Sequence, residues 1–339
     1  MFQKDQQIDG SNIKVLGLRW DTKRDRMSID TDKFYKRMVA TTKREVLASI
    51  ASLYDPLGYL APVTMKMRLF LQQLWNKEKD WDDQMDKEDI ESWRQIVEEA
   101  NALTSIDVPR YIGKEKSQLI CFCDASKNAY ATAIYLKTMD QGQSKVNLIF
   151  AKSRIAPKKT MSIPRLELLA LLIGIRSLKF VSKELELENT QKIVWTDSQC
   201  VLHWLKSSKP LSTFVKNRIA EITEEKNVEF RYINTKDNPA DIPSRGMSSE
   251  DLQSCKLWWN GPDWLKDDIS SWPTWNVEKV DQNTIQMIQS EVKGPTTLYE
   301  ATILAQEPKE LKEEPNRIEK PFGLDEQKYS TYNKVFNIQ

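Results

Sequence analysis

Leu119-Ile120-Cys121-Phe122-Cys123-Asp124 is an apolar run that ends in a carboxylate, and this stretch decides the fold. A second apolar run, 193–196, is followed in the same way by Asp197. Apolar strands do not tolerate unpaired carboxylates, so we expect these acids to lie at the ends of two strands. Glu167, one turn into a predicted helix, and Asp241, after another strand-like run, complete a set of four acids.

The four acids predict a metal site. Several carboxylates that converge at strand ends are typical of a hard cation with oxygen ligands. A zinc site of cysteines and histidines is excluded, because the four cysteines form no Cys-x-x-Cys pair and the chain has one histidine, His203. The candidate catalytic and metal-binding residues are Asp124, Glu167, Asp197 and Asp241.

Residues 117–246 alternate between strand and helix patterns. The predicted strands are 119–123, 129–136, 146–151, 192–195 and 228–233, and the predicted helices are 164–183, 198–205 and 213–226. Three strands in succession followed by helix–strand units indicate an α/β domain with a mixed five-stranded sheet and helices on its faces.

The residues before this domain predict a strand pair and then a small helical module. We expect strands at 15–20 and 27–29, and helices that begin at Thr41, at Val63 and near residue 86. Thr42 can cap the first of these helices, because Glu45 follows three residues later.

Five segments follow from these patterns. They are a strand pair (1–40), a helical module (41–112), the α/β domain (113–250), a Trp-rich linker (251–280) and a polar tail without stable structure (281–339). We expect a fragment of about 112–250 to fold alone, because an α/β core buries its own strands. We expect the linker tryptophans to pack against the domain, the alternative being stacking on bases.

Charge is informative only where it is local. The chain has 50 Lys and Arg against 49 Asp and Glu, so its net charge says nothing about nucleic acid. Between Lys145 and Glu167, however, six basic residues occur without an acid, which suits phosphate contacts, although a solvated loop would look the same. The candidate nucleic-acid-binding residues are Lys152, Arg154, Lys158, Lys159, Arg165, Ser126 and Ser198. For Ser198, capping of the following helix is the favoured role.

The hydropathy of the sequence indicates where the protein is located. Its first residues are polar, and the longest apolar run, 168–175, has 8 residues, whereas a bilayer requires about 20. We therefore expect an intracellular protein without a membrane partner.

Several motifs resemble the ribonuclease H region of BEL/Pao long-terminal-repeat retrotransposon polyproteins. They are Phe122–Ser126, Ile163–Leu168, Trp195–Ser198 and Asn238–Gly246, with Leu53–Gly58 upstream and Leu257–Leu265 downstream. The resemblance implies a ribonuclease H type 1-like fold that hydrolyses the RNA strand of RNA–DNA hybrids with two Mg²⁺ or Mn²⁺ ions. It implies that Asp124 is shared by both ions, that Glu167 and Asp197 flank it, and that Asp241 binds the second ion. It also implies that residues 1–40 resemble the end of a polymerase palm and that residues 41–112 resemble a thumb or connection module. It further implies a cytoplasmic setting, in a virus-like particle, or a nuclear one.

Other parts of such a polyprotein have no counterpart in the sequence. There is no Tyr-x-Asp-Asp of a polymerase, no Asp-Thr/Ser-Gly of an aspartic protease, and too few histidines for a His₂Cys₂ integrase module. We therefore expect a polyprotein fragment whose partners are RNA–DNA hybrid and the polymerase and integrase parts. Residues 232–237 also lack the histidine that many ribonucleases H place near the last acid. The alternative is a non-catalytic nucleic-acid-binding or structural remnant.

Overall fold

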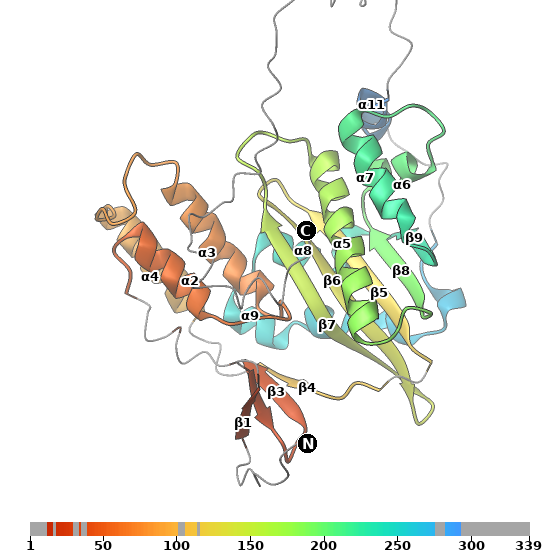
Figure 1. The fold of residues 1–339 in the computed structure, drawn as a ribbon, viewed down its shortest axis with the longest axis horizontal. Helices are drawn as coiled ribbons and strands as arrows, with labels where there is room; N and C mark the ends of the chain where they lie inside the picture. Colours follow the sequence, from red (N-terminus) through yellow and green to blue (C-terminus); the bar gives the residue numbers. More distant parts are fainter. Residues whose placement is uncertain are drawn as a thin grey trace, which may run out of the picture.

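The computed structural model describes residues 12–15, 18–29, 34, 39–100, 106–113, 116–274 and 282–292. Within these residues the chain forms a five-stranded sheet, a small four-stranded sheet and a group of helices beside them (Figure 1).

The five-stranded sheet has the order β7-β6-β5-β8-β9. Its strands are β5 (Gln118–Ala125), β6 (Ala129–Asp140), β7 (Gln143–Ile155), β8 (Gln191–Thr196) and β9 (Val228–Tyr232). β5, β6 and β7 pair antiparallel, whereas β8 runs parallel to both β5 and β9. The sheet is mixed, as the sequence predicts, and β6 and β7 extend beyond their predicted ends.

One face of this sheet is covered by α5 (Ile163–Glu184), which packs on β5 and β6. Gly174 permits the close approach, because a Cβ atom there would lie 2.4 Å from the Cys123 sulfur. The helices α6 (Gln199–Lys206) and α7 (Thr213–Glu224) pack beside α5 and complete this layer. The leucines and isoleucines of α5 bury a continuous apolar core against the strands.

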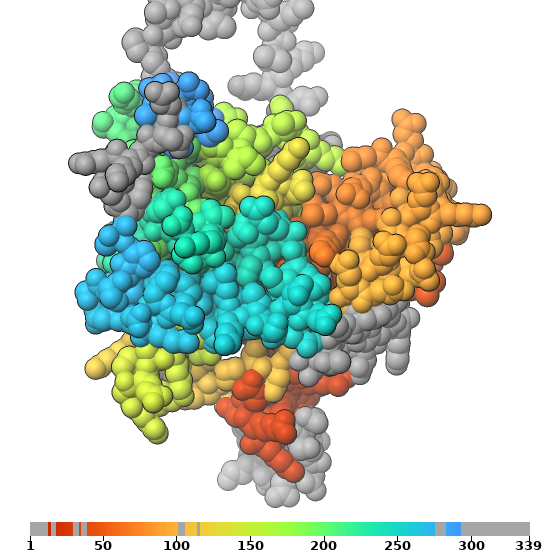
Figure 2. Space-filling view, turned by 180° about the vertical axis from the view of Figure 1, so that it is seen from behind, coloured from red at the N-terminus to blue at the C-terminus, as the bar shows by residue number. Residues whose placement is uncertain are grey.

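The opposite face is covered by the residues that follow β9. They form α8 (Asp241–Arg245), α9 (Ser249–Ser254), α10 (Lys256–Asn260) and the short 3₁₀ helices η2 (Asp263–Lys266) and η3 (Ile269–Ser271). This segment, cyan to blue in Figure 2, runs across the rear of the molecule. Trp258 and Trp272 are buried there, which confirms the predicted packing, whereas Trp275 lies outside the described residues.

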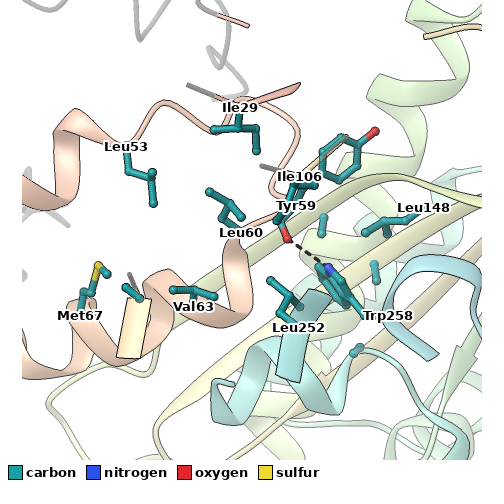
Figure 3. Packing of buried hydrophobic residues seen from close by; sticks show 14 of the residues in the cluster. Ile29, Leu53, Tyr59, Leu60, Val63, Met67, Ile106, Leu148, Leu252 and Trp258 are labelled. Carbon is teal, nitrogen blue, oxygen red and sulfur yellow. Dashed lines mark hydrogen bonds between the residues drawn. The ribbon is translucent and has the colours of Figure 1, made fainter. Parts of the chain in front are cut away.

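The helical module consists of α2 (Lys43–Ser52), α3 (Ala61–Leu74) and α4 (Lys87–Ala100). The Thr42 side chain accepts a hydrogen bond from the Glu45 amide, so the predicted N-cap is confirmed. α3 contacts β7 and α8, and its residues share one hydrophobic core with the second face of the sheet. Figure 3 shows Leu60 and Val63 of this module beside Trp258 in that core.

That shared core revises the expected autonomy of residues 112–250. Phe122, Tyr135 and Trp195 project from the sheet into a core whose other members come from α3 and from residues 252–272. A fragment without both flanks would leave this face of the sheet exposed.

The small sheet has the order β1-β2-β3-β4, with β1 Asn12–Val15, β2 Leu18–Asp21, β3 Arg26–Ile29 and β4 Asp107–Pro109. The expectation of one strand over 15–20 is wrong, because Val15 pairs with Leu18 in an antiparallel ladder. β4 was not predicted; it pairs with β3 and returns the chain from the helical module.

The turn before α3 attaches the module to the edge of the large sheet. The Ala151 amide of β7 donates a hydrogen bond of 2.8 Å to the Leu57 carbonyl. Gly58 follows with φ +75°, and a Cβ atom there would lie 1.9 Å from the Ala151 oxygen. The Asp55 carboxylate accepts hydrogen bonds from the Tyr59 and Leu60 amides and so fixes the start of α3.

The polar tail expected from residue 281 does not begin there. Residues Gln282–Ser290 form a helix, α11, which packs against α6. The rest of that predicted tail lies outside the described residues. Within the described residues, no helix is long and apolar enough to cross a membrane.

Candidate active site

The candidate site lies at the carboxyl ends of β5 and β8. These strands are parallel, and Cys123 is in register with Thr196, so the next residues, Asp124 and Asp197, emerge at the same edge. α5 begins at this edge and brings Glu167 to it after one turn.

Asp241 is brought to the site by the loop after β9. The Asn238 side chain is buried, donates a hydrogen bond of 3.0 Å to the Cys123 carbonyl, and accepts one of 3.1 Å from the Ala240 amide. Asn238 thus ties the loop to the end of β5, and Asp241 follows as the first residue of α8.

Each acid accepts a hydrogen bond from the protein. Ser244 Oγ donates to Asp124 Oδ2 at 2.5 Å, and Thr235 Oγ1 donates to Asp197 Oδ2 at 2.6 Å. The other two bonds are Arg245 Nε to Asp241 Oδ1, at 2.6 Å, and the Ser198 hydroxyl to Glu167.

Sequence reasoning missed the donors Ser244, Arg245 and Thr235. Ser244 and Arg245 follow Asp241 by three and four residues, a helical spacing that could have revealed them. Thr235 carries no such signal, because it approaches Asp197 from another loop.

The acids are close enough to perturb one another. Burial, together with the charge of Asp197, raises the pKa of Asp124 from 3.8 to about 7. Burial, with the charges of Asp197 and Asp124, raises the pKa of Glu167 from 4.5 to about 8. The pKa of Asp197 is also raised, by burial and then by Asp241, against the hydrogen bond from Thr235. The structure therefore brings all four predicted acids into one interacting cluster.

No three His, Cys, Asp or Glu side chains in the described ranges stand close enough to hold a metal ion as they are. The donor chemistry nevertheless suits a hard divalent cation, since all four groups offer oxygen. The Oδ1 atom of Asp197 is buried and accepts no hydrogen bond from the described residues. A buried anionic oxygen without a hydrogen bond destabilises the fold unless a cation or a proton neutralises it. The four acids therefore suit a divalent metal ion.

The predicted nucleic-acid-binding residues lie in several environments. Arg154 and Lys159 are exposed, and the Lys158 ammonium lies over the Trp75 ring at 5.8 Å. Burial lowers the pKa of Lys152, and the charges of Arg154 and Arg176 lower it further. Arg165 is engaged by a carboxylate of the same chain, Glu291.

The two predicted serines hold the site's backbone. Ser198 caps α6, because its hydroxyl accepts a hydrogen bond from the Val201 amide, which confirms the favoured role. Ser126 Oγ donates to the Ser244 carbonyl at 2.7 Å and accepts from the Asn128 and Ala129 amides, so it joins the β5–β6 turn to α8.

Comparison with solved structures finds similar chains. The foamy viral protease–reverse transcriptase dRH in complex with double-stranded DNA is 14% identical over 66% of this chain, with a TM-score of 0.44. This chain covers 38% of that protein. LC11-RNase H1, isolated from compost, is 18% identical over 42% of this chain and 98% of its own length, with a TM-score of 0.28. RNase H1 from the halophilic archaeon Halobacterium salinarum NRC-1 is 11% identical over 41% of this chain and 98% of its own length, with a TM-score of 0.27.

A comparison with curated proteins finds no match. Among protein families, the model described as Pao retrotransposon-like RNaseH-like domain matches residues 42–198, somewhat less than half of the 339 residues. The match includes the helical module and the acids Asp124, Glu167 and Asp197, and it ends before Asp241. Residues 42–198 are therefore similar to the Pao retrotransposon-like RNaseH-like domain.

Proposed function

We propose that this chain is a retrotransposon-derived nuclease that hydrolyses the RNA strand of RNA–DNA hybrids with the help of divalent metal ions. The observation that carries the proposal is the cluster of Asp124, Glu167 and Asp197 at one sheet edge. There the charge of Asp197 helps to raise the pKa of Asp124, and the charges of both aspartates help to raise the pKa of Glu167. The family match of the residues that hold these acids supports it.

Asp124, Glu167, Asp197 and Asp241 would hold Mg²⁺ or Mn²⁺, which activates water and neutralises charge on the phosphate during the reaction. With pKa values of about 7 and about 8, Asp124 and Glu167 retain protons near neutral pH. These protons must leave before the oxygens can serve as ligands, so metal affinity should rise with pH. Ser244 and Thr235 would orient the carboxylates of Asp124 and Asp197.

The hybrid would be recognised by its shape. Its minor groove exposes 2′-hydroxyl groups, which distinguish the RNA strand without reading sequence. The exposed Arg154 lies near the end of β7, and the partly stacked Lys158 and exposed Lys159 follow this strand on the way to the Glu167 helix. These three side chains would contact phosphates.

The second candidate is a non-catalytic nucleic-acid-binding or structural remnant. One observation favours it: the Asp241 carboxylate forms an ion pair with Arg245 at 2.6 Å. The guanidinium therefore already neutralises one of the four proposed metal ligands. In that case the fold would remain while turnover is lost.

An assay with the full chain tests the proposal. The RNA strand of a hybrid is end-labelled and incubated with the protein in Mg²⁺ or Mn²⁺, beside double-stranded DNA and double-stranded RNA. We expect fragments from the hybrid alone, and Asp197→Asn should reduce the rate by at least about 100-fold, since even outer-shell partners of a metal are worth 10–100-fold.

Asp263→Asn is the matched control, because this carboxylate is 93% exposed and lies outside the cluster. It should cleave like the unaltered chain. Hybrid binding without cleavage in either metal would refute the nuclease and support the remnant.

A further inference from the structure

Residues 282–292, which we call the strap, dock beside the candidate active site. Trp204 of α6 donates a hydrogen bond from Nε1 to the Ile288 carbonyl at 3.4 Å. The Ser212 amide donates to the Glu291 carbonyl at 2.8 Å, next to an isolated β-bridge between Leu211 and Val292. The strap therefore closes onto α6 and the start of α7, and Figure 1 shows α11 beside these helices.

The side chain of Glu291 is bound by Arg165 and Ser212, which together we call the fork. Arg165 donates from Nε to Glu291 Oε1 at 2.5 Å and from Nη2 to Oε2 at 3.0 Å, and the Ser212 hydroxyl also bonds to Oε2. The Phe214 ring supports the guanidinium, 4.9 Å from its centroid. The Glu291 side chain is only 8% exposed.

The carboxylate in this fork is ionised. Burial alone would raise the pKa of Glu291, but hydrogen bonds from Arg165 and Ser212 outweigh burial and lower it. The fork is thus a formed anion site with an anion in it.

A phosphate group satisfies the same donors. A planar guanidinium binds carboxylate and phosphate in the same two-pronged geometry, and a hydroxyl can donate to either. The charged oxygens of Glu291 therefore stand where two oxygens of a phosphodiester would fit.

The fork lies close to the acids of the candidate active site. Arg165 and Glu167 lie within one turn of α5, so their backbones are only a few ångströms apart. The strap also packs on α6, whose capping residue Ser198 bonds to Glu167. A nucleic-acid strand that reaches the acids would pass close to the fork.

We propose that Arg165 and Ser212 form a binding site for a backbone phosphate of the nucleic acid, and that Glu291 of the strap occupies this site in its absence. Strap and nucleic acid then compete for the same donors, and the strap lowers affinity until it is displaced. The identity of the ligand as RNA–DNA hybrid rests on the proposed function.

Hybrid binding in Ca²⁺-free and Mg²⁺-free buffer tests the competition apart from cleavage. Glu291→Gln removes the competing charge and should tighten binding by about 3- to 10-fold at low salt. The log–log salt slope should steepen by about 0.7–0.9, the value of one gained phosphate contact. Combining it with Arg165→Ala should abolish both gains.

Glu221→Gln is the matched control. Glu221 of α7 forms the same two-pronged pair with Arg176 of α5 and does not belong to the strap. An equal gain in this variant would mean that any lost negative charge suffices, and it would overturn the proposal. A second variant, Ile288→Ser, weakens the apolar contact of the strap with the fork's residues intact, and it should also tighten binding.

Hydrogen exchange supplies a readout that does not depend on affinity. The Ser212 amide, protected by the Glu291 carbonyl, should exchange faster when hybrid is added to the unaltered chain. Unchanged exchange with bound hybrid would overturn the proposal, as would failure of both the unaltered chain and Glu291→Gln to bind hybrid.

The two proposals can fail separately. Cleavage by the unaltered chain without a gain in Glu291→Gln would refute the phosphate site and keep the nuclease. Tighter hybrid binding by Glu291→Gln without cleavage in any metal would support the phosphate site and refute the nuclease.

Discussion

The indole N–H of Trp258 donates a hydrogen bond of 3.1 Å to the Tyr59 carbonyl, a residue 199 positions earlier in the chain (Figure 3). The Trp258 carbonyl in turn accepts a bond of 2.7 Å from the Tyr135 hydroxyl on β6. A residue after the large sheet therefore connects the helical module to a strand of that sheet, and the three parts share one core.

Removal of both flanks should therefore abolish cooperative folding. A fragment 113–250 would expose the apolar side chains of Phe122, Tyr135 and Trp195, and a patch of that kind favours association. Thermal unfolding followed by circular dichroism should show no sharp transition, whereas a fragment 39–274 should unfold cooperatively. A sharp transition in the short fragment would show that the sheet needs neither flank.

Gly58→Ala should lower the free energy of unfolding by several kcal/mol. The new Cβ would lie 1.9 Å from the Ala151 oxygen, so the turn before α3 would have to leave β7. Gly142→Ala is the control, because Gly142 has a similar φ of +79° with nothing within 4 Å of its Cβ.

Gly142→Ala should cost only about 1 kcal/mol of backbone strain. Urea unfolding of both variants separates the two effects. Equal losses would mean that contact with β7 contributes nothing.

Asp124→Asn should raise the melting temperature of the metal-free protein above about pH 7, where the Asp124 carboxyl is ionised. The amide carries no charge to repel Asp197 and keeps an oxygen that can accept from Ser244. Calorimetry should also show that millimolar Mg²⁺ or Mn²⁺ raises the melting temperature of the unaltered chain but not of the variant. A metal effect of the same size in both proteins would place the ion elsewhere.

Asp55 should make stability depend on pH between about 4 and 6. Burial is the main reason that the pKa of Asp55 rises from 3.8 to about 6, against hydrogen bonds from the Leu60 and Tyr59 amides. Between these values the folded state holds a proton that the unfolded state lacks. The contribution of Asp55 to stability is therefore complete below pH 3.8 and is lost as the pH rises through 6.

Ionisation of Asp55 lowers the free energy of unfolding by at most about 3 kcal/mol, because each unit of pKa shift corresponds to about 1.36 kcal/mol. Urea unfolding of the unaltered chain and of Asp55→Asn at pH 4, 5, 6 and 7 measures it. The free energy of unfolding of Asp55→Asn should rise relative to that of the unaltered chain as the pH rises. A constant difference over this range would show that Asp55 does not titrate there.

The parts of the fold that depend on local sequence could be predicted. β5 and β8 contain apolar runs that are followed by an acid, and the caps Thr42 and Ser198 are set by neighbours within three residues. The acids of the site could be found for the same reason, since two of them end such runs.

Contacts between distant residues could not be predicted. β4 has three residues, too few for a pattern, and exists because β3 pairs with it. α11 is a helix of nine residues, and Glu291 directly after it forms an ion pair with a residue 126 positions away. Thr235 reaches Asp197 only because two loops meet at the end of the sheet.

The bond between the Leu57 carbonyl and the Ala151 amide has a consequence for self-association. β7 is a 13-residue strand at the edge of the sheet, and an edge strand of that length can pair with a strand of another molecule. The turn before α3 occupies one of its backbone donors and covers the middle of the strand. Proteolysis within residues 53–60 would uncover that edge, and we expect the cleaved protein to form intermolecular β-structure that the intact chain avoids.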